Sequence, residues 1–441
     1  MVRGTREVYI QHSLFSIKMA VSFVALSASL LGTSSALAGT SVNYVADAGD
    51  PTQTFFSKAG MRLRGACIGT AVDVRVLSTR SKHKASTFAA NAQSDITETN
   101  SSQQHYFGVK KLHSKTDDFQ LLTNSGLAAY DSSVGQLIQA ERRRVLTIDW
   151  LAEAEEDALG SDCVFGGTKR VAEKGSNRAI IYRADKGSAQ RRIYDGLADL
   201  RAECVSNGGT PELNLYVRNG IPTTSTYIAS QSDADNNGLD EAAYSQAEAS
   251  SGAKIQLDVS GVADDRASGQ IVINSSNDQY SIDWIASSSG ALGRDCLFAG
   301  TVRRVNASSL GARIAYSTFT ADALHTFFDH GGVTLGASCS ATPDLFMNVG
   351  SAVAASTAHW GMQSDANGDG LDSHAYDEAD DLAPTDVPVL GATEDENAIG
   401  EMVFAAPGGD YTTLEFIADE EGIFGHADCA IAGTSEVAHA P

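Results

Sequence analysis

After residue 38 the sequence lacks an apolar run of the ~20 residues that a membrane-spanning helix requires. It also lacks a GxSxG or HExxH motif, a Walker loop and a CxxC pair, and its 10 histidines do not recur at equivalent positions of the repeat described below. We therefore expect a mature chain without a transmembrane segment, and a protein that is not an enzyme.

The N-terminus has the features of a signal peptide. Arg3, Arg6 and Lys18 precede an apolar run from Met19 to Leu31, and small residues follow up to Ala38. This run is too short for a membrane anchor, which is the weaker alternative. The pattern predicts a signal peptide over residues 1–38, with Met19 as an alternative start of translation. The mature protein is expected to be secreted, to the extracellular space, the cell surface or the periplasm.

The rest of the chain contains an internal repeat. Its clearest landmark holds Cys163, Cys296 and Cys429, which follow one another at steps of 133 residues. The three segments read LTIDWLAEAEEDALGSDCVFGGTKRV, YSIDWIASSSGALGRDCLFAGTVRRV and TTLEFIADEEGIFGHADCAIAGTSEV. Two further landmarks keep the same order, one ending near Cys67, Cys204 and Cys339 and one ending at Asp95, Asp233 and Asp365. These landmarks predict three modules, over residues 39–173, 174–307 and 308–441.

Between the landmarks, apolar and polar residues alternate in segments such as VDVRVL, ELNLYV and GQIVIN, with glycine and asparagine between them. This alternation is typical of half-buried antiparallel strands. We predict an all-β protein of three tandem β-sandwiches or flattened barrels, each closed by a disulfide and containing seven or eight strands. Only the segments 123–142 and 241–250 resemble helices. The short linkers favour a stiff rod of modules in contact.

Six cysteines allow fifteen pairings, but the repeat selects one. If the modules fold alike, the pairs are Cys67–Cys163, Cys204–Cys296 and Cys339–Cys429, and such bonds imply an oxidising compartment. The rings of Trp150, Trp284 and Phe416, 12 or 13 residues before the second cysteine of each pair, are expected to pack in the core near the bridge. The string GACIG around Cys67 resembles a nucleophile elbow, but the aligned cysteines lack the glycines.

Two acidic loops carry the pattern DxDxDG, DADNNGLDE in module 2 and DANGDGLDS in module 3, whose oxygens suit Ca²⁺. The loops resemble the calcium loops of thrombospondin type 3 repeats and dockerins. They depart from an EF-hand at position twelve, where Tyr244 and Tyr376 replace glutamate, and module 1 lacks the glycine. The alternative is a solvated Asx-rich turn. The candidate ligands are Asp233, Asp235, Asn237, Asp240, Glu241, Asp365, Asn367, Asp369 and Asp372.

The formal net charge of −23 is concentrated in module 3, which has 22 acidic side chains and a single basic one, Arg313. Module 1 instead has basic clusters at Lys82–Lys84, Lys110–Lys111 and Arg142–Arg144. A secreted chain of this acidity is not expected to bind nucleic acid. The charge separation is consistent with solvated faces, and it also suggests head-to-tail docking of module 3 on module 1 of another copy.

Three classes of function are compatible with these features. The first is a noncatalytic secreted or cell-surface protein, structural or adhesive, that contacts other copies of itself or an extracellular polymer. The second is a carbohydrate-binding protein in which Trp360 or Tyr227 stacks on a sugar, and the third is a secreted hydrolase with paired carboxylates such as Glu155 and Glu156.

Overall fold

A computed structural model describes 21 ranges of the chain, and all of them belong to one compact unit, Leu37–Pro441. The ranges are 39–69, 71–79, 86–95, 103–112, 118–121, 132–154, 161–196, 198–219, 225–233, 241–247, 254–257, 266–275, 278–288, 291–306, 312–319, 321–341, 344–365, 373–382, 387–390, 397–420 and 429–439.

The described residues are almost entirely β-strands, as the alternation predicted, but each module contributes ten strands and not the seven or eight expected. Module 1 has β1 (Gly39–Ala46), β2 (Gln53–Lys58), β3 (Met61–Ile68), β4 (Ala71–Ser78), β5 (Ser86–Asp95), β6 (Gln103–Leu112), β7 (Asp118–Gln120), β8 (Ser132–Ala140), β9 (Arg144–Glu153) and β10 (Cys163–Glu173). Module 2 has β11 (Ala179–Ala184), β12 (Ser188–Asp195), β13 (Ala198–Asn207), β14 (Thr210–Asn219), β15 (Ser225–Asp233), β16 (Glu241–Ala247), β17 (Lys254–Leu257), β18 (Arg266–Asn274), β19 (Asp278–Ser287), the 3₁₀ turn η2 (Ala291–Gly293) and β20 (Cys296–Asn306). Module 3 has β21 (Arg313–Thr318), β22 (Asp322–His330), β23 (Val333–Cys339), β24 (Leu345–Ser351), β25 (Ser356–Asp365), β26 (Ser373–Leu382), β27 (Val387–Leu390), β28 (Asn397–Ala406), β29 (Asp410–Asp419) and β30 (Cys429–His439).

Each module is a β-sandwich of one six-stranded and one four-stranded sheet with the same strand order. The six-stranded sheets run β1-β10-β9-β8-β5-β6, β11-β20-β19-β18-β15-β16 and β21-β30-β29-β28-β25-β26. The four-stranded sheets run β2-β3-β4-β7, β12-β13-β14-β17 and β22-β23-β24-β27. All strand pairs inside a module are antiparallel. Identical topology in all three explains why the sequence landmarks recur in the same order.

The two segments that resembled helices are strands where the structure describes them. Residues 132–140 of the first form β8, and residues 241–247 of the second form β16. Pairing with neighbouring strands outweighs the weak helix preference of their alanine and serine residues.

A disulfide joins the two sheets of each sandwich. The bonds are Cys67–Cys163, Cys204–Cys296 and Cys339–Cys429, which are the pairs that the repeat selected. Trp150, Trp284 and Phe416 are fully buried in the three module cores, as predicted. Trp150 stacks on Phe165 with ring centroids 5.2 Å apart, and the cores are thus aromatic beside the bridge. Because Cys67 forms one of these bonds, the nucleophile-elbow interpretation of GACIG is wrong.

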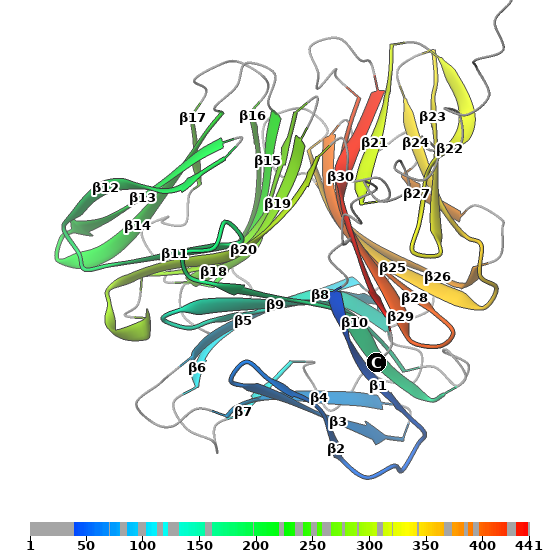
Figure 1. Cartoon of the computed structure of the whole chain (residues 1–441), viewed down its shortest axis with the longest axis horizontal. Helices are drawn as coiled ribbons and strands as arrows, with labels where there is room; N and C mark the ends of the chain where they lie inside the picture. The colour runs from blue at the N-terminus through cyan, green and yellow to red at the C-terminus, as the bar shows by residue number, and fades with distance from the viewer. Residues whose placement is uncertain are drawn as a thin grey trace, which may run out of the picture. The chain divides into compact units, whose positions relative to one another are not determined.

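The central strands of the six-stranded sheets are buried on both faces, whereas the four-stranded sheets are not. In β3 buried and exposed residues alternate at first, with Met61 and Leu63 inside and Arg62 and Arg64 outside. In β8 all nine residues are buried. One face of the large sheet covers the core of its own sandwich, so the other face must contact a different part of the chain. Figure 1 shows the large sheets of the three modules facing one another, with the small sheets farther out.

These second faces meet in three apolar patches that connect the modules in a cycle. Ile138 and Val145 of module 1 pack with Leu297 of module 2. Val272 of module 2 packs with Ile417 of module 3.

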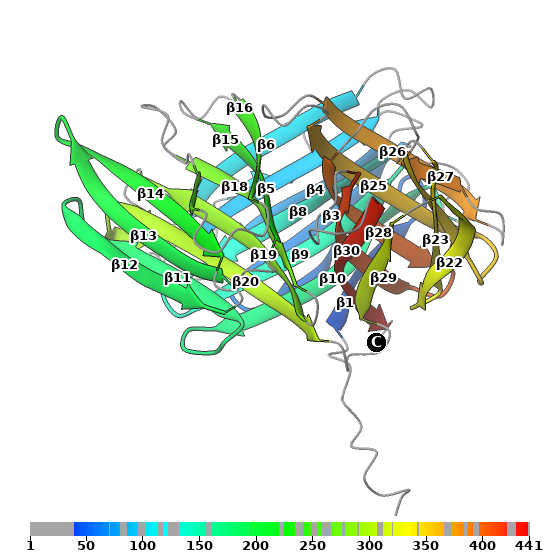
Figure 2. The ribbon, with the colours of Figure 1, turned by 90° about the horizontal axis from the view of Figure 1, so that it is seen from above.

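The third patch closes the cycle. Leu151 and Val164 of module 1 pack with Tyr411 of module 3. The first strand also pairs in parallel with the last, through Gly39↔Ala438. A linear rod has no contact between its first and third modules, so the expected rod is wrong. Figure 2 shows β1 and β30 from above.

Candidate functional site

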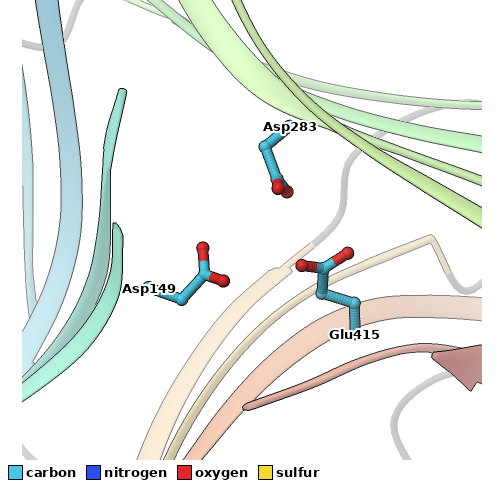
Figure 3. Close-up of side chains that lie close together, drawn as sticks. All are labelled: Asp149, Asp283 and Glu415. Atoms are coloured by element: carbon cyan, nitrogen blue, oxygen red, sulfur yellow. The ribbon is translucent and has the colours of Figure 1, made fainter. Parts of the chain in front are cut away.

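Three buried carboxylates, one from each module, lie together where the large sheets meet (Figure 3). They belong to Asp149 in β9, Asp283 in β19 and Glu415 in β29, and one oxygen of each lies within 4.8 Å of the others. All three residues are at most 1% exposed. We call Asp149, Asp283 and Glu415 the carboxylate triad. It could hold a metal ion, because three carboxylate oxygens at this spacing can converge on one cation.

The period-two geometry of a strand places the triad there. Each triad residue directly precedes a core aromatic ring, namely Trp150, Trp284 or Phe416. Successive side chains of a strand point to opposite faces, so a ring in the module core sends the preceding carboxylate to the intermodule face. The sequence IDW or LEF in an otherwise buried strand therefore dictates where this charge lies.

Two arginines pair with the triad. Arg170 Nη1 lies 2.8 Å from Asp149, its Nη2 lies 3.1 Å from Glu415, and the guanidinium also contacts Asp283. Arg303 Nη2 lies 3.2 Å from Glu415. Both guanidinium groups also lie 3.2 Å from a fourth carboxylate, that of Glu436. The arginine side chains are only 10% and 6% exposed, so these ion pairs are screened little by water.

The residues of this centre obey the repeat, with one departure. Arg170 and Arg303 stand three residues after Gly167 and Gly300, and Glu436 occupies the same place after Gly433. Module 3 thus has a carboxylate where modules 1 and 2 have a guanidinium.

At a second position, module 3 has a carboxylate where modules 1 and 2 have a neutral amide. Gln136 in β8 corresponds to Gln270 in β18 and to Glu401 in β28. The centre therefore contains five carboxylates and two guanidinium groups. Modules 1 and 2 each contribute one carboxylate and one guanidinium group. The excess of three carboxylates comes entirely from module 3.

Burial of this excess charge raises the pKa values of the carboxyl groups. Desolvation raises the pKa of Asp149 to about 6 against the opposing effect of Arg170, and it raises that of Glu436 to about 8. The pKa values of Asp283 and Glu401 are also well above the ordinary range, because both are buried and face other carboxylates. Burial alone would lower the pKa of Arg170, but its four carboxylate neighbours raise it, so this group keeps its charge.

Three hydroxyl pairs around the centre link the modules. Thr147 shares a hydrogen bond of 2.8 Å with Thr301, and Ser281 shares one of 3.1 Å with Thr434. Thr413 and Thr168 form the third, at 2.8 Å. The bonds join module 1 to 2, 2 to 3 and 3 to 1 through equivalent positions. The three large sheets are thus related by an approximate threefold axis that passes through the polar centre.

The glycines that precede the hydroxyl residues cannot be replaced without a clash. A Cβ atom on Gly167 would lie 1.9 Å from the carbonyl oxygen of Asp149. The corresponding distances are 2.6 Å for Gly300 and Asp283, and 2.1 Å for Gly433 and Glu415. The repeated Gly-Thr pair in the sequence therefore has a backbone-packing function beside the triad.

A small cavity of about 70 Å³ lies on the same axis. It is lined by polar residues of modules 1, 2 and 3, including Gln136, Gln270 and Glu401. Gln93 and Gln363, which are equivalent residues of β5 and β25, complete its polar lining. The side chain of their module 2 equivalent, Gln231, lies outside the described residues.

The predicted calcium loops connect β15 to β16 and β25 to β26. Asp233 and Asp365 end the first strand of each pair, and Glu241 begins β16. The ligand residues between them, from Asp235 to Asp240 and from Asn367 to Asp372, lie outside the described residues, as do the side chains of Asp233, Glu241 and Asp365.

Tyr376, which stands at position twelve of the module 3 loop, belongs to a module interface. It is 1% exposed, and its hydroxyl donates to Ser132 of module 1 at 2.7 Å. The buried His359 lies 2.9 Å from the same hydroxyl and 3.7 Å from Glu153 of module 1. The departure from the EF-hand pattern at this position thus serves contact between modules 1 and 3.

The carbohydrate hypothesis loses one of its two aromatic residues. Trp360 is 1% exposed and lies in the core of module 3, so it cannot stack on a sugar. The Tyr227 side chain lies outside the described residues, as do Glu155 and Glu156.

Sequence reasoning did not identify the triad or its arginines, although all five lie inside the quoted landmark segments. The available signal was an acidic residue before an aromatic one in three largely apolar strands, followed 20 or 21 residues later by arginine in two of the three modules. Recurrence of a charge in a buried strand indicates an interface, because an unpaired buried charge is too costly to keep.

Comparisons with known proteins identify no family. No protein-family profile and no curated protein match the sequence. One similar solved structure is dimeric latent PorU from Porphyromonas gingivalis, at 8% identity and a TM-score of 0.12, over 91% of this chain and 34% of that one. Our chain thus spans about a third of that protein, and a likeness this weak carries no argument. Within the described ranges no helix has the length and apolarity needed to cross a bilayer.

Proposed function

We propose that this chain is a secreted, noncatalytic structural or adhesive protein in which three β-sandwiches act as one stiff unit. The observation that carries the proposal is the cycle of contacts between the large sheets. Repeated modules commonly supply reach or avidity, and here they are locked to each other by apolar patches, hydroxyl pairs and buried ion pairs.

Three disulfides indicate an oxidising compartment, since such bonds are reduced in most cytosols. Together with the signal peptide expected over residues 1–38, they support secretion. The described chain has no free cysteine to act as a nucleophile.

A partner would be met by the small sheets, whose outer faces contact water. All eight residues of β12 and eight of the nine residues of β22 are exposed or partly exposed, Arg191 and Thr326 among them. We propose that an extracellular polymer or a second copy contacts these faces. A screen of the mature chain against extracellular-matrix and cell-wall polymers tests this, and the absence of any binding or self-association would remove the adhesive half of the proposal.

Calcium at the β15–β16 and β25–β26 loops is the second part of the proposal. It rests on the two DxDxDG patterns at the ends of paired strands. Extracellular calcium modules bind with Kd values of about 10⁻⁴–10⁻³ M, so near-millimolar calcium would stabilise each by about 1 kcal/mol. A thermal melt with calcium and with EDTA tests this, with Asp235→Asn/Asp369→Asn as the loop-disabled control.

Charge complementarity between modules 1 and 3 already operates inside one chain, where Arg170 contacts Glu415 and Glu436. Head-to-tail docking between chains would have to use other groups, such as the exposed Arg142 and Arg143. Sedimentation at low and high salt tests it, because such an assembly would grow as salt is lowered. A monomer at both salt concentrations would dispose of this idea.

A further inference from the structure

The axial cavity combines excess negative charge with oxygen atoms that lack hydrogen-bond partners. The Oε1 atoms of Gln93, Gln363 and Glu401 are buried and accept no hydrogen bond. Gln363 is only 6% exposed. The same lining also contains one buried donor without a partner, Gln270 Nε2. One amide group cannot satisfy three acceptors and the negative charge of Glu401. The excess of acceptors around the cavity therefore indicates an occupant that supplies positive charge or protons.

The repeat shows that this charge is not an inevitable result of the architecture. With arginine at position 436 and glutamine at 401, as in modules 1 and 2, the centre would contain three carboxylates and three guanidinium groups and would be neutral. Module 3 has glutamate at both positions. These two departures produce the whole excess, and one of them, Glu401, lines the cavity.

Glu415 of the carboxylate triad also has carboxylate oxygens that accept no hydrogen bond. Its Oε1 lies 3.1 Å from Arg170 and 3.2 Å from Arg303, but neither contact has hydrogen-bond geometry. Its Oε2 is also buried without a hydrogen bond. The two arginines therefore only partly compensate the carboxylates that surround them.

We propose that the axial cavity binds a hydrated hard cation, with the Glu401 carboxylate as its charged ligand and the amide oxygens of Gln93 and Gln363 as neutral ligands. Carboxylate and amide oxygens suit Ca²⁺ and similar ions, and the described lining residues include no histidine or cysteine that would favour a softer metal. No arginine lines the cavity either, so the cation does not have to displace a guanidinium group.

The size of the cavity suits this occupant. The cavity volume of about 70 Å³ exceeds the about 10–15 Å³ that one water molecule needs, so there is room for a cation together with bound water. Gly361 makes room for one ligand, since a Cβ there would lie 2.4 Å from Gln93 Oε1. The ligands come from modules 1 and 3, and the cation would therefore hold these two modules together.

The test uses the mature chain, residues 39–441, with its disulfides formed and the acidic loops disabled by Asp235→Asn/Asp369→Asn. Calcium binding at pH 8 is measured by calorimetry after treatment with EDTA. We expect one Ca²⁺ per chain on this background. Absence of binding would overturn the axial site, while the loop proposal is tested separately by the chain with intact loops.

Two single substitutions on that background locate the ion. Glu401→Gln introduces the residue that modules 1 and 2 carry at this position, so the fold is expected to survive, and calcium binding should be lost. Glu436→Gln removes the same charge from a residue outside the cavity lining and should weaken binding without abolishing it. Equal binding by the Glu401→Gln variant and its parent would refute the proposal.

Crystals grown with Tb³⁺ provide a direct measurement. An anomalous peak within coordination distance of Glu401 is the expected result. A cavity that holds only water, or an ion bound only at the loops, would overturn the proposal whatever the calorimetry shows.

Discussion

Modules 1 and 2 differ from module 3 at the polar centre, although their strands have the same order and register. Arg170 and Arg303 balance Asp149 and Asp283, whereas module 3 contributes Glu401, Glu415 and Glu436 and no cation. Water solvates an acidic surface at little cost in free energy. Glu415, however, is fully buried, and Glu401 and Glu436 are largely removed from water. The difference teaches that the acidity of module 3 is more than a surface property, and that it makes the module depend on its neighbours.

The largest effect is expected from removing the guanidinium group of Arg170, which contacts four of the five carboxylates of the centre. Arg170→Met should lower the free energy of unfolding by about 3–5 kcal/mol, because it leaves buried carboxylates uncompensated. Urea denaturation at pH 8 measures this. Arg303→Met is the matched control in module 2. It should cost less, since Arg303 contacts Asp149 only at 3.5 Å and does not contact Asp283 in the described structure. Equal losses would mean that the two arginines are equivalent.

The pH dependence of stability should be opposite to that of an ordinary salt-bridged carboxylate. The pKa of Asp149 rises from 3.8 to about 6 on folding, and that of Glu436 rises from 4.5 to about 8. A raised folded-state pKa stabilises the fold below the unfolded value, and this contribution is lost as the pH rises through the folded value.

In EDTA, the free energy of unfolding should therefore fall between about pH 4 and pH 8, by up to about 3 kcal/mol for Asp149 alone at 1.36 kcal/mol per pKa unit. Urea denaturation across this range measures it. The variant Glu436→Gln should show a smaller fall, and a wild-type chain that becomes more stable toward pH 8 would contradict the assignment.

The destabilisation caused by replacing a repeat glycine with alanine should be larger where the new Cβ atom comes closer to the backbone. Gly167→Ala, with a contact of 1.9 Å, should destabilise by about 1–3 kcal/mol, and Gly300→Ala, with 2.6 Å, by less. Thermal melts compare the two. If the order were reversed, the local backbone would have to relax more easily in module 1 than in module 2.

The smallest effects should come from the hydroxyl pairs. Thr168→Val removes one hydrogen bond, to Thr413 in module 3, and should cost about 1 kcal/mol. Thr147→Val removes the equivalent bond to module 2 and should cost the same, which makes it the matched control. A much larger loss for Thr168 would show that the contact between modules 1 and 3 is the weak point of the cycle.

Much of the fold could be predicted because it depends on local patterns and on the repeat. Alternating residues predicted the strands, and equal spacing selected the disulfide pairs, for example Cys67–Cys163. The helix-like segment around β8 was misleading, because a strand buried on both faces loses the alternation that identifies it. The triad was missed for the same reason, since Asp149 in LTIDWLA reads as one polar residue in a core strand.

The sequence by itself determined the three-module repeat, its disulfides and the uneven distribution of charge, because each of these follows from residue types and their spacing along the chain. Only the tertiary structure decided that the modules meet in a cycle, and that Asp149, Asp283 and Glu415 converge. These residues are more than 130 positions apart, and no local pattern states which buried faces will meet. That choice depends on the shape and charge of complete sheets, which exist only after each sandwich has folded.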